Sequence, residues 1–263
     1  FLAPLHLFAQ YWYHTRLIGN LGFLEYILVT PSHHRVHHAI NPEYLDKNYS
    51  QIFIFWDKMF NTFQPELDDV KPVYGTLRPV STWNPIIINY KHIWQIIKDT
   101  WHTKSYLNKI KIWFMPTGWR PDDVKQRFPL KEVKNPYNQI KYAIQNPPKL
   151  IIWTWMQYII TSILIFHFFI IMESQSIMLN YIYAVFLIVN IFSFTAILDN
   201  QKYIMIVESL KSVFILGLIY FQGFSWFDLS GIYVIILLFY SFISPLVTYY
   251  CYNNMFTKYS LKS

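Results

Sequence analysis

The chain has 263 residues, of which 54% are hydrophobic and 20% aromatic, a composition that excludes an ordinary soluble domain and favours an integral membrane protein. Its formal net charge of +7 is uneven, because residues 1–149 hold 18 Lys and Arg against 11 Asp and Glu whereas residues 150–263 hold 4 of each. A basic half joined to an apolar half is typical of contact with anionic lipid, and no sequence motif indicates a nucleic-acid partner.

The amino-terminal segment, residues 1 to about 18, begins apolar and then becomes polar and aromatic. It is typical of the end of a transmembrane helix that emerges at the membrane surface, with Tyr11, Trp12 and Tyr13 at the level of the lipid headgroups. His14 follows directly, one short connection before a cluster of histidines.

The histidine cluster, His33–His38, contains four imidazoles within six residues. Thr30 is a suitable N-cap and Pro31 suits the first helical position, so a helix is predicted to begin here. The positive end of that helix disfavours a protonated imidazole. The rings are therefore expected to be neutral and able to donate lone pairs.

The spacing of these histidines predicts a metal site. His34, His37 and His38 stand at i, i+3 and i+4 and project to one side of a helix, with His33 at the edge of that arc as a weaker candidate. The alternatives are a solvated basic patch, a pH sensor or adventitious metal binding. Zinc is the nearer rival, but five histidines, including His14, without an accompanying cysteine fit an all-nitrogen iron site better.

Several motifs around this cluster are shared with a known family. They are Trp12-Tyr13-His14-Thr15, His34-x-x-His37-His38, Asp46-Lys47-Asn48-Tyr49 and Trp56-Asp57. Together they resemble the fatty acid hydroxylase/sterol desaturase superfamily. The longer run from Gln10 to Glu66 is similar to the branch that cleaves alkylglycerol ether lipids, including its bacterial members.

The resemblance implies a membrane-bound, non-haem di-iron enzyme that uses O2 to hydroxylate a lipid C–H bond. His14, His34, His37 and His38 would be iron ligands. Two electrons would come from an external donor, either tetrahydrobiopterin or a redox protein acting as an electron-transfer partner. The superfamily has two earlier histidine clusters, which this sequence lacks, so we expect the chain to be the carboxyl-terminal part of a longer enzyme.

Three polar residues after the cluster are candidates for orienting the ligand histidines. They are Asp46, Asn48 and Asp57, and the reason is that a ligating imidazole usually donates its other ring nitrogen to a carboxylate or carbonyl. A helix cap or a surface salt bridge is an equally good interpretation of each.

Asn84 and Pro85 are predicted to open an amphipathic helix that ends near Thr100. This basic, tryptophan-rich helix either lies on the membrane surface or packs on the catalytic helices. His92 and His102 are isolated and are interpreted as surface residues.

Four segments in the second half are each near the length of about 20 residues that crosses a bilayer. They are Leu150–Met172, Ile177–Leu198, Tyr203–Gln222 and Gly231–Cys251. The distribution of Lys and Arg between the connections places residues 39–149, and with them the metal site, on the cytoplasmic face. Cys251 is the single cysteine, so an internal disulfide is excluded.

Two polar features lie inside these spans. Glu208 and Lys211 are functional candidates by default, but their i, i+3 spacing favours an ion pair with a structural role. His167 is expected to bond to a neighbouring helix rather than to a metal.

The predicted fold is all-α, an integral membrane helical bundle with a cytoplasmic, histidine-rich, metal-binding helical cap. Residues 1–63 would be the carboxyl-terminal part of the di-iron hydroxylase domain, and 64–149 a basic cytoplasmic connector. Residues 150–251 would form the four-helix transmembrane region, and 252–263 a cytoplasmic tail.

Two other functions are consistent with the sequence. The second hypothesis is a sterol or fatty-acid hydroxylase or desaturase, because motif similarity does not fix the lipid. The third is a non-catalytic membrane protein that stores or transports metal. A transporter would place its ligands near the bilayer midplane, whereas these histidines are predicted at the interface.

Overall fold

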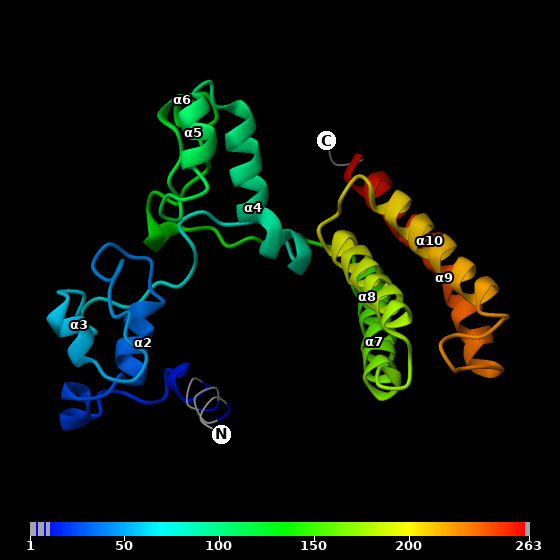
Figure 1. Ribbon diagram of the computed structural model, residues 1–263, viewed down its shortest axis with the longest axis horizontal. Helices are drawn as coiled ribbons and strands as arrows, with labels where there is room; N and C mark the ends of the chain where they lie inside the picture. Colours follow the sequence, from blue (N-terminus) through cyan, green and yellow to red (C-terminus); the bar gives the residue numbers. More distant parts are fainter. Residues whose placement is uncertain (1–3, 5–7, 9–10, 261–263) are drawn as a thin grey trace. The chain divides into compact units, whose positions relative to one another are not determined.

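The computed structural model of the chain describes Pro4, Phe8 and residues 11–260. Residues 1–3, 5–7, 9 and 10 of the predicted membrane segment at residues 1 to about 18 therefore lie outside the described residues. Within the described part, the regular structure is helical and β-pairing is limited to isolated bridges. The chain divides into two compact units (Figure 1), unit 1 with Phe1–Pro79 and Arg120–Lys141, and unit 2 with Val80–Trp119 and Tyr142–Ser263.

The two units divide the predicted connector, residues 64–149, between them. Residues 64–79 and 120–141 belong to unit 1, whereas residues 80–119 and 142–149 belong to unit 2. The sequence-based domain assignments remain a prediction.

Unit 1 is built from short helices joined by turns and extended segments. They are η1 (Gly22–Tyr26), α2 (Pro31–His37), α3 (Phe55–Met59), α6 (Asp122–Arg127) and η2 (Pro136–Asn138). A small apolar core of Val36, Ala39 and Tyr44 lies beside α2. The Tyr44 hydroxyl donates to the Val70 carbonyl at 2.6 Å and accepts from the Leu67 amide at 2.8 Å, so hydrogen bonds hold the loops where the core is small.

The start of α2 confirms the prediction from Thr30 and Pro31. Thr30 has an extended backbone at the N-cap, and Pro31 is the first helical residue. The Thr30 amide donates to Nδ1 of His33 at 3.4 Å, and the Ser32 hydroxyl donates to the Glu25 carboxylate at 2.9 Å. These contacts fix the first turn of the helix that carries His34 and the later histidines.

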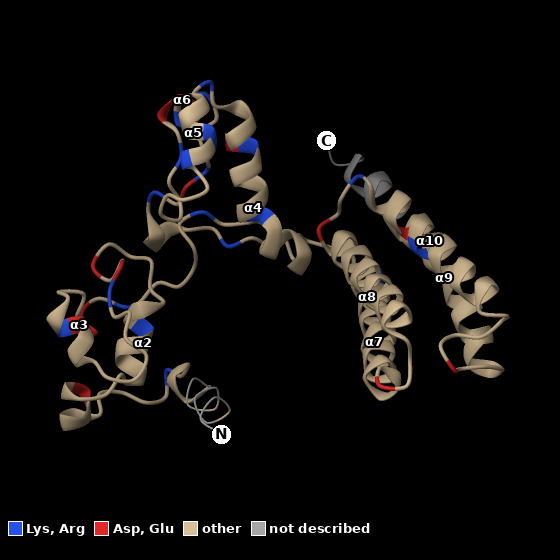
Figure 2. Cartoon of the chain, viewed as in Figure 1, with Lys and Arg blue, Asp and Glu red and all other residues tan. Residues whose placement is uncertain are grey.

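Unit 2 contains the long helices. They are α4 (Pro85–His102), α7 (Pro148–Ile171), α8 (Ile177–Leu198), α9 (Ile204–Phe221) and α10 (Ile232–Ser260), together with the short α5 (Tyr106–Lys111). Helices α7 to α10 are apolar and long enough to cross a membrane, which confirms the four predicted spans. The last helix continues beyond the predicted end at Cys251. Figure 2 shows these spans as largely free of charge, in contrast to α4 and α5.

The spans pack in sequence order, with α7 along α8 and α9 along α10 (Figure 1). One end of the bundle is filled by aromatic rings around Tyr183, whose hydroxyl lies 2.9 Å from Nδ1 of His167 and 3.2 Å from Nε1 of Trp226. His167 therefore bonds from α7 to α8, as predicted. The protein is an integral membrane protein with a helical bundle.

Candidate metal centre

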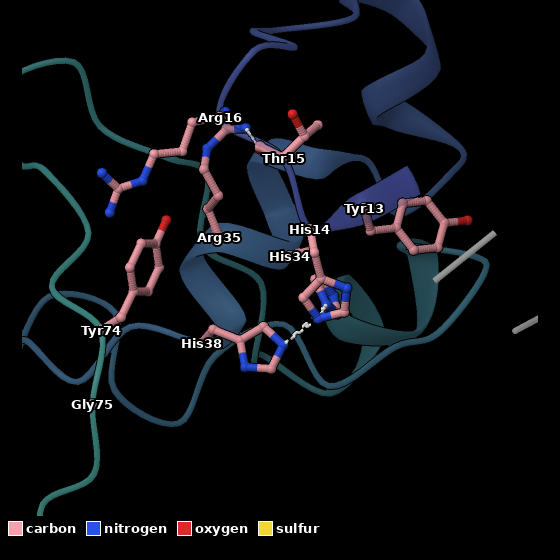
Figure 3. A pocket seen from close by; sticks show the side chains of 9 residues that line it. All are labelled: Tyr13, His14, Thr15, Arg16, His34, Arg35, His38, Tyr74 and Gly75. Carbon is pink, nitrogen blue, oxygen red and sulfur yellow. Dashed lines mark hydrogen bonds between the residues drawn. The ribbon is translucent and has the colours of Figure 1, made fainter. Parts of the chain in front are cut away.

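Three imidazole nitrogens converge in unit 1. Nε2 of His14 lies 2.9 Å from Nε2 of His34 and 3.1 Å from Nε2 of His38, and the last two atoms are 3.0 Å apart. His34 and His38 are one helical turn apart, at the middle and the carboxyl-terminal end of α2, whereas His14 comes from the segment before η1. Figure 3 shows the His14 and His38 rings pointing toward each other across the site.

This triangle of nitrogens is not satisfied by hydrogen bonds among its own members. A neutral imidazole presents either an N–H or a lone pair at Nε2, and a hydrogen bond needs one of each. Among three mutually adjacent nitrogens, at least one pair must place like against like. A cation that faces three lone pairs, with the ring protons on Nδ1, removes the conflict.

The separations also fit metal coordination. Nitrogens at about 2.1 Å from a metal and at right angles to one another would be about 3.0 Å apart, whereas a tetrahedral arrangement would separate them by about 3.4 Å. The observed distances of 2.9–3.1 Å match the first arrangement. Three ligands on one side of a metal leave the opposite side open to further ligands, and the donor set suits iron as well as zinc.

The electrostatics of the site favour neutral rings. Burial, together with the adjacent His38, His14 and His37, lowers the pKa of His34 to about 4. Burial also lowers the pKa of His38, helped by His37 and His14. Rings that resist protonation keep their lone pairs available to a metal.

Arg35 positions the segment that carries His14. Its guanidinium donates through Nη1 to the carbonyls of Thr15 and Ile18, at 2.9 and 2.8 Å. Through Nε and Nη2 it binds the carboxylate of Glu66, with the Nε contacts at 2.9 and 3.1 Å. Because Thr15 directly follows His14, Arg35 ties the upstream ligand to the helix that carries the other two.

His37 and His33 lie outside the three-nitrogen cluster. The exposed His37 ring has its centroid 5.7 Å from that of His34 and 5.1 Å from that of His38. The sequence placed His37 in the same ligand arc, and its role as a ligand stays a prediction. His33 is 1% exposed, with Nε2 facing Glu25 at 3.7 Å, so it is a buried residue of α2 that points away from the three nitrogens.

A cavity of about 330 Å³ opens beside the three histidines (Figure 3). Its lining is mainly apolar and includes, besides the histidines, Tyr13, Thr15, Arg16, Arg35, Tyr74 and Gly75. The Arg16 guanidinium stacks on the Tyr74 ring, 4.9 Å from its centroid. The histidines therefore face a space large enough for part of a substrate or for further ligands.

The predicted orienting residues have other partners. Asp57 is buried and accepts from the Tyr49 and Ser50 amides and the Thr62 hydroxyl. Asn48 donates to the carbonyls of His33 and Gln64 and also accepts from the Gln64 amide. Asp46 accepts from the Tyr49 hydroxyl, so each of the three shapes the loops around the helix.

Sequence reasoning missed Arg35, Glu66 and Glu25 as parts of this region. Glu25 accepts hydrogen bonds from Thr30, Ser32 and the Leu21 amide, which fixes the entry to α2. One signal was available, because Glu25 is the only acidic residue before position 43. An isolated carboxylate ahead of four histidines is a candidate partner for one of them.

Comparison with known proteins supports the family resemblance of the amino-terminal part. Residues 1–62 match the family model described as fatty acid hydroxylase. Alkylglycerol monooxygenase of Homo sapiens is 45% identical over 127 residues, which are 48% of this chain and 28% of that protein. The same enzyme of Xenopus tropicalis is 46% identical over 116 residues (44% and 26%), and that of Danio rerio 44% over 119 residues (44% and 26%).

The chain thus spans about a quarter of the length of the curated relatives it matches. No solved structure matches it. The amino-terminal part of the chain matches the fatty acid hydroxylase family model and is similar to the alkylglycerol monooxygenases.

Proposed function

We propose that the chain supplies metal ligands to a membrane-bound, non-haem di-iron monooxygenase that hydroxylates a lipid C–H bond. The observation that carries the proposal is the convergence of the three Nε2 atoms of His14, His34 and His38 at 2.9–3.1 Å. The match of residues 1–62 to the fatty acid hydroxylase family and the four membrane-spanning helices support it.

In this proposal His14, His34 and His38 hold one iron, and the exposed His37 is available to a second. When bound, iron would supply the activation of dioxygen, which no amino-acid side chain provides. The chain's own residues would hold three neutral nitrogens in place. Arg35 fixes the position of His14, and the largely apolar cavity beside the histidines offers space for part of a lipid.

The substrate we propose is an alkylglycerol ether lipid. Hydroxylation of the carbon beside the ether oxygen would give a hemiacetal, which collapses to an aldehyde and a glycerol. The similarity to alkylglycerol monooxygenases over nearly half of the chain supports this choice. The two electrons would come from tetrahydrobiopterin or from an electron-transfer protein.

We also propose that the site faces the cytoplasm. The support is the charge of the connections, since Lys149 and Lys202 lie at the same end of the spans and the connections at the opposite end have no Lys or Arg.

The test is turnover by the protein in membranes, loaded with Fe(II) and given O2 and a reductant. We expect release of a fatty aldehyde from an alkylglycerol and loss of that product in His34→Ala, whereas His92→Ala should be nearly silent. Oxidation of a fatty acid or a sterol instead would favour the sterol or fatty-acid hydroxylase or desaturase. Stoichiometric metal without oxidation of any lipid would favour metal storage or transport.

A further inference from the structure

Helix α4 exposes most of its large apolar side chains. Its apolar stripe is exposed, and the largest exposed fractions belong to Trp101 at 81%, Tyr90 at 63% and Trp94 at 56%. Among its polar side chains, only the one of Asp99 is buried. Asp99 is only 2% exposed, and its carboxylate accepts from the Gln95 amide at 2.8 Å.

The same pattern continues through α5 and the turn after it. Tyr106 is 85% exposed, Leu107 73% and Phe114 83%. An apolar surface of this extent needs a non-aqueous neighbour, because single exposed apolar residues are ordinary but a continuous row of large ones is not.

Lysines of α4 and α5 lie next to aromatic rings. The ammonium groups of Lys98 and Lys109 lie 5.5 and 6.0 Å from the ring centroids of Trp94 and Tyr106, and that of Lys111 lies 5.5 Å from Trp119. Residues 80–119 contain five lysines and one aspartate. Tryptophan and tyrosine mixed with lysine are typical of the headgroup region of a bilayer, and the charge is complementary to anionic lipid.

The structure also ties α4 to the end of a membrane span. Asp199 caps the carboxyl-terminal end of α8 and accepts from the Trp83 amide at 2.9 Å, from the Tyr142 hydroxyl at 2.9 Å and from the Thr82 hydroxyl. The helix α4 therefore begins at the level where α8 leaves the hydrocarbon. With Lys91, Lys98 and Asp99 within its 18 residues, α4 is too polar to cross the bilayer itself.

We propose that residues 85–114 form an interfacial platform, a helical hairpin that lies on the membrane with Trp101, Tyr106 and Phe114 in the headgroup region of an anionic bilayer. This inference does not depend on the reaction proposed above. The occupant is lipid, because the exposed stripe is continuous with the membrane-spanning unit and carries the charge that anionic headgroups attract.

The experiment uses the full chain in a Cys251→Ser background, reconstituted in phosphatidylcholine vesicles with and without phosphatidylserine. Single cysteines replace Trp101, Tyr106 or Phe114 and carry a spin label, whose accessibility to O2 and to a water-soluble nickel chelate is measured. His92→Cys, which is exposed on α4 outside the apolar stripe, is the matched control. Phe239→Cys on α10 reports that the bundle is inserted.

We expect the ratio of O2 to nickel accessibility at the three platform positions to be several-fold higher than at His92, and to rise with phosphatidylserine. Each lysine near the surface contributes about fivefold to attraction by an anionic membrane. The triple variant Lys98→Gln, Lys109→Gln, Lys111→Gln should therefore lose the dependence on phosphatidylserine. Platform labels open to the nickel chelate in both vesicles would overturn the proposal, and labels shielded from both reagents would show a protein occupant instead.

Discussion

The protein has two clusters of polar side chains that differ in how their members pair with one another. In unit 2, Lys211 is fully buried, and its ammonium binds Glu208, Gln157 and Ser244, each at 2.8 Å. In unit 1, His14, His34 and His38 bring three identical nitrogens together, which cannot all be partners of one another. We call the first the closed cluster, because its two charges are paired with each other, and the second the open cluster, which we propose binds a cation.

The closed cluster draws partners from every span. Gln157 of α7 accepts from Lys211, and the carboxylate of Glu208 accepts from Ser193 of α8 and from Ser244 and Thr248 of α10. The two charges sit one turn apart on α9 and cancel each other. Charged residues inside a membrane are therefore not evidence for a functional site until their partners are known, and here the partners indicate a structural role.

The largest effect is expected from opening the closed cluster. Lys211→Met leaves the Glu208 carboxylate buried without its cation, which should cost about 3–5 kcal/mol of bundle stability. The double variant Glu208→Gln, Lys211→Met removes both charges and should recover most of that loss. Unfolding of the helices in mixed detergent, followed by circular dichroism, measures the difference.

Glu173→Gln, in the exposed connection between α7 and α8, is the control for that experiment and should be silent. A double variant as unstable as Lys211→Met would show that the cluster does more than neutralise one charge. None of these variants should change metal binding in unit 1.

A second prediction concerns how the open cluster is held together. Arg35→Gln removes the bonds to the Thr15 and Ile18 carbonyls and to Glu66, so His14 loses its fixed position. Loss of a residue that orients a metal ligand typically lowers affinity about 10–100-fold. A competition titration with Co(II) against a chelator measures it.

Arg78→Gln is the matched control, because Arg78 pairs with Glu132 in a half-exposed ion pair outside the cavity lining. It should leave Co(II) affinity unchanged. Equal losses in the two variants would mean that the Arg35 effect is a general loss of charge.

The smallest effect on metal binding is expected at Asp57, a buried carboxylate that accepts its hydrogen bonds within unit 1. Burial acts to raise the pKa of this carboxyl, but hydrogen bonds from Ser50, Thr62 and Tyr49 outweigh it and hold the pKa below its ordinary value of 3.8. A lowered pKa means that Asp57 stabilises the fold at pH above its ordinary pKa and loses this contribution as the pH falls through the lowered value.

Asp57→Asn should therefore lower the free energy of local unfolding by about 1–3 kcal/mol at neutral pH. It should also weaken the dependence of that free energy on acid pH. Amide hydrogen exchange of Tyr49 and Ser50, which donate to the carboxylate, is the measurement. Unchanged exchange at those amides, or a loss of metal as large as in Arg35→Gln, would contradict the assignment of Asp57 to loop structure.

Local sequence rules predicted much of the fold. The N-cap at Thr30, the start of α4 at Asn84 and the four spans follow from capping residues and from hydrophobic length, which are properties of neighbouring residues. The cap of α4 is made as expected, with Asn84 accepting from the Ile86 amide at 3.0 Å.

What local rules missed depends on contacts between distant parts of the chain. The helical period identified the apolar stripe of α4 but not that it faces outward. It also gave the pairing of Glu208 with Lys211 but not the partners from the other spans. His14 entered the candidate ligands through family resemblance, and its place beside His34 depends on Arg35, which nothing in the residue spacing indicates.

The central claim, that His14, His34 and His38 hold one metal together, is tested most directly by anaerobic titration of the metal-free chain with Fe(II). The account predicts one tightly bound equivalent that His14→Ala loses as fully as His34→Ala, while His37→Ala and His92→Ala retain it. A His14→Ala variant that binds this equivalent with unchanged affinity would contradict the claim.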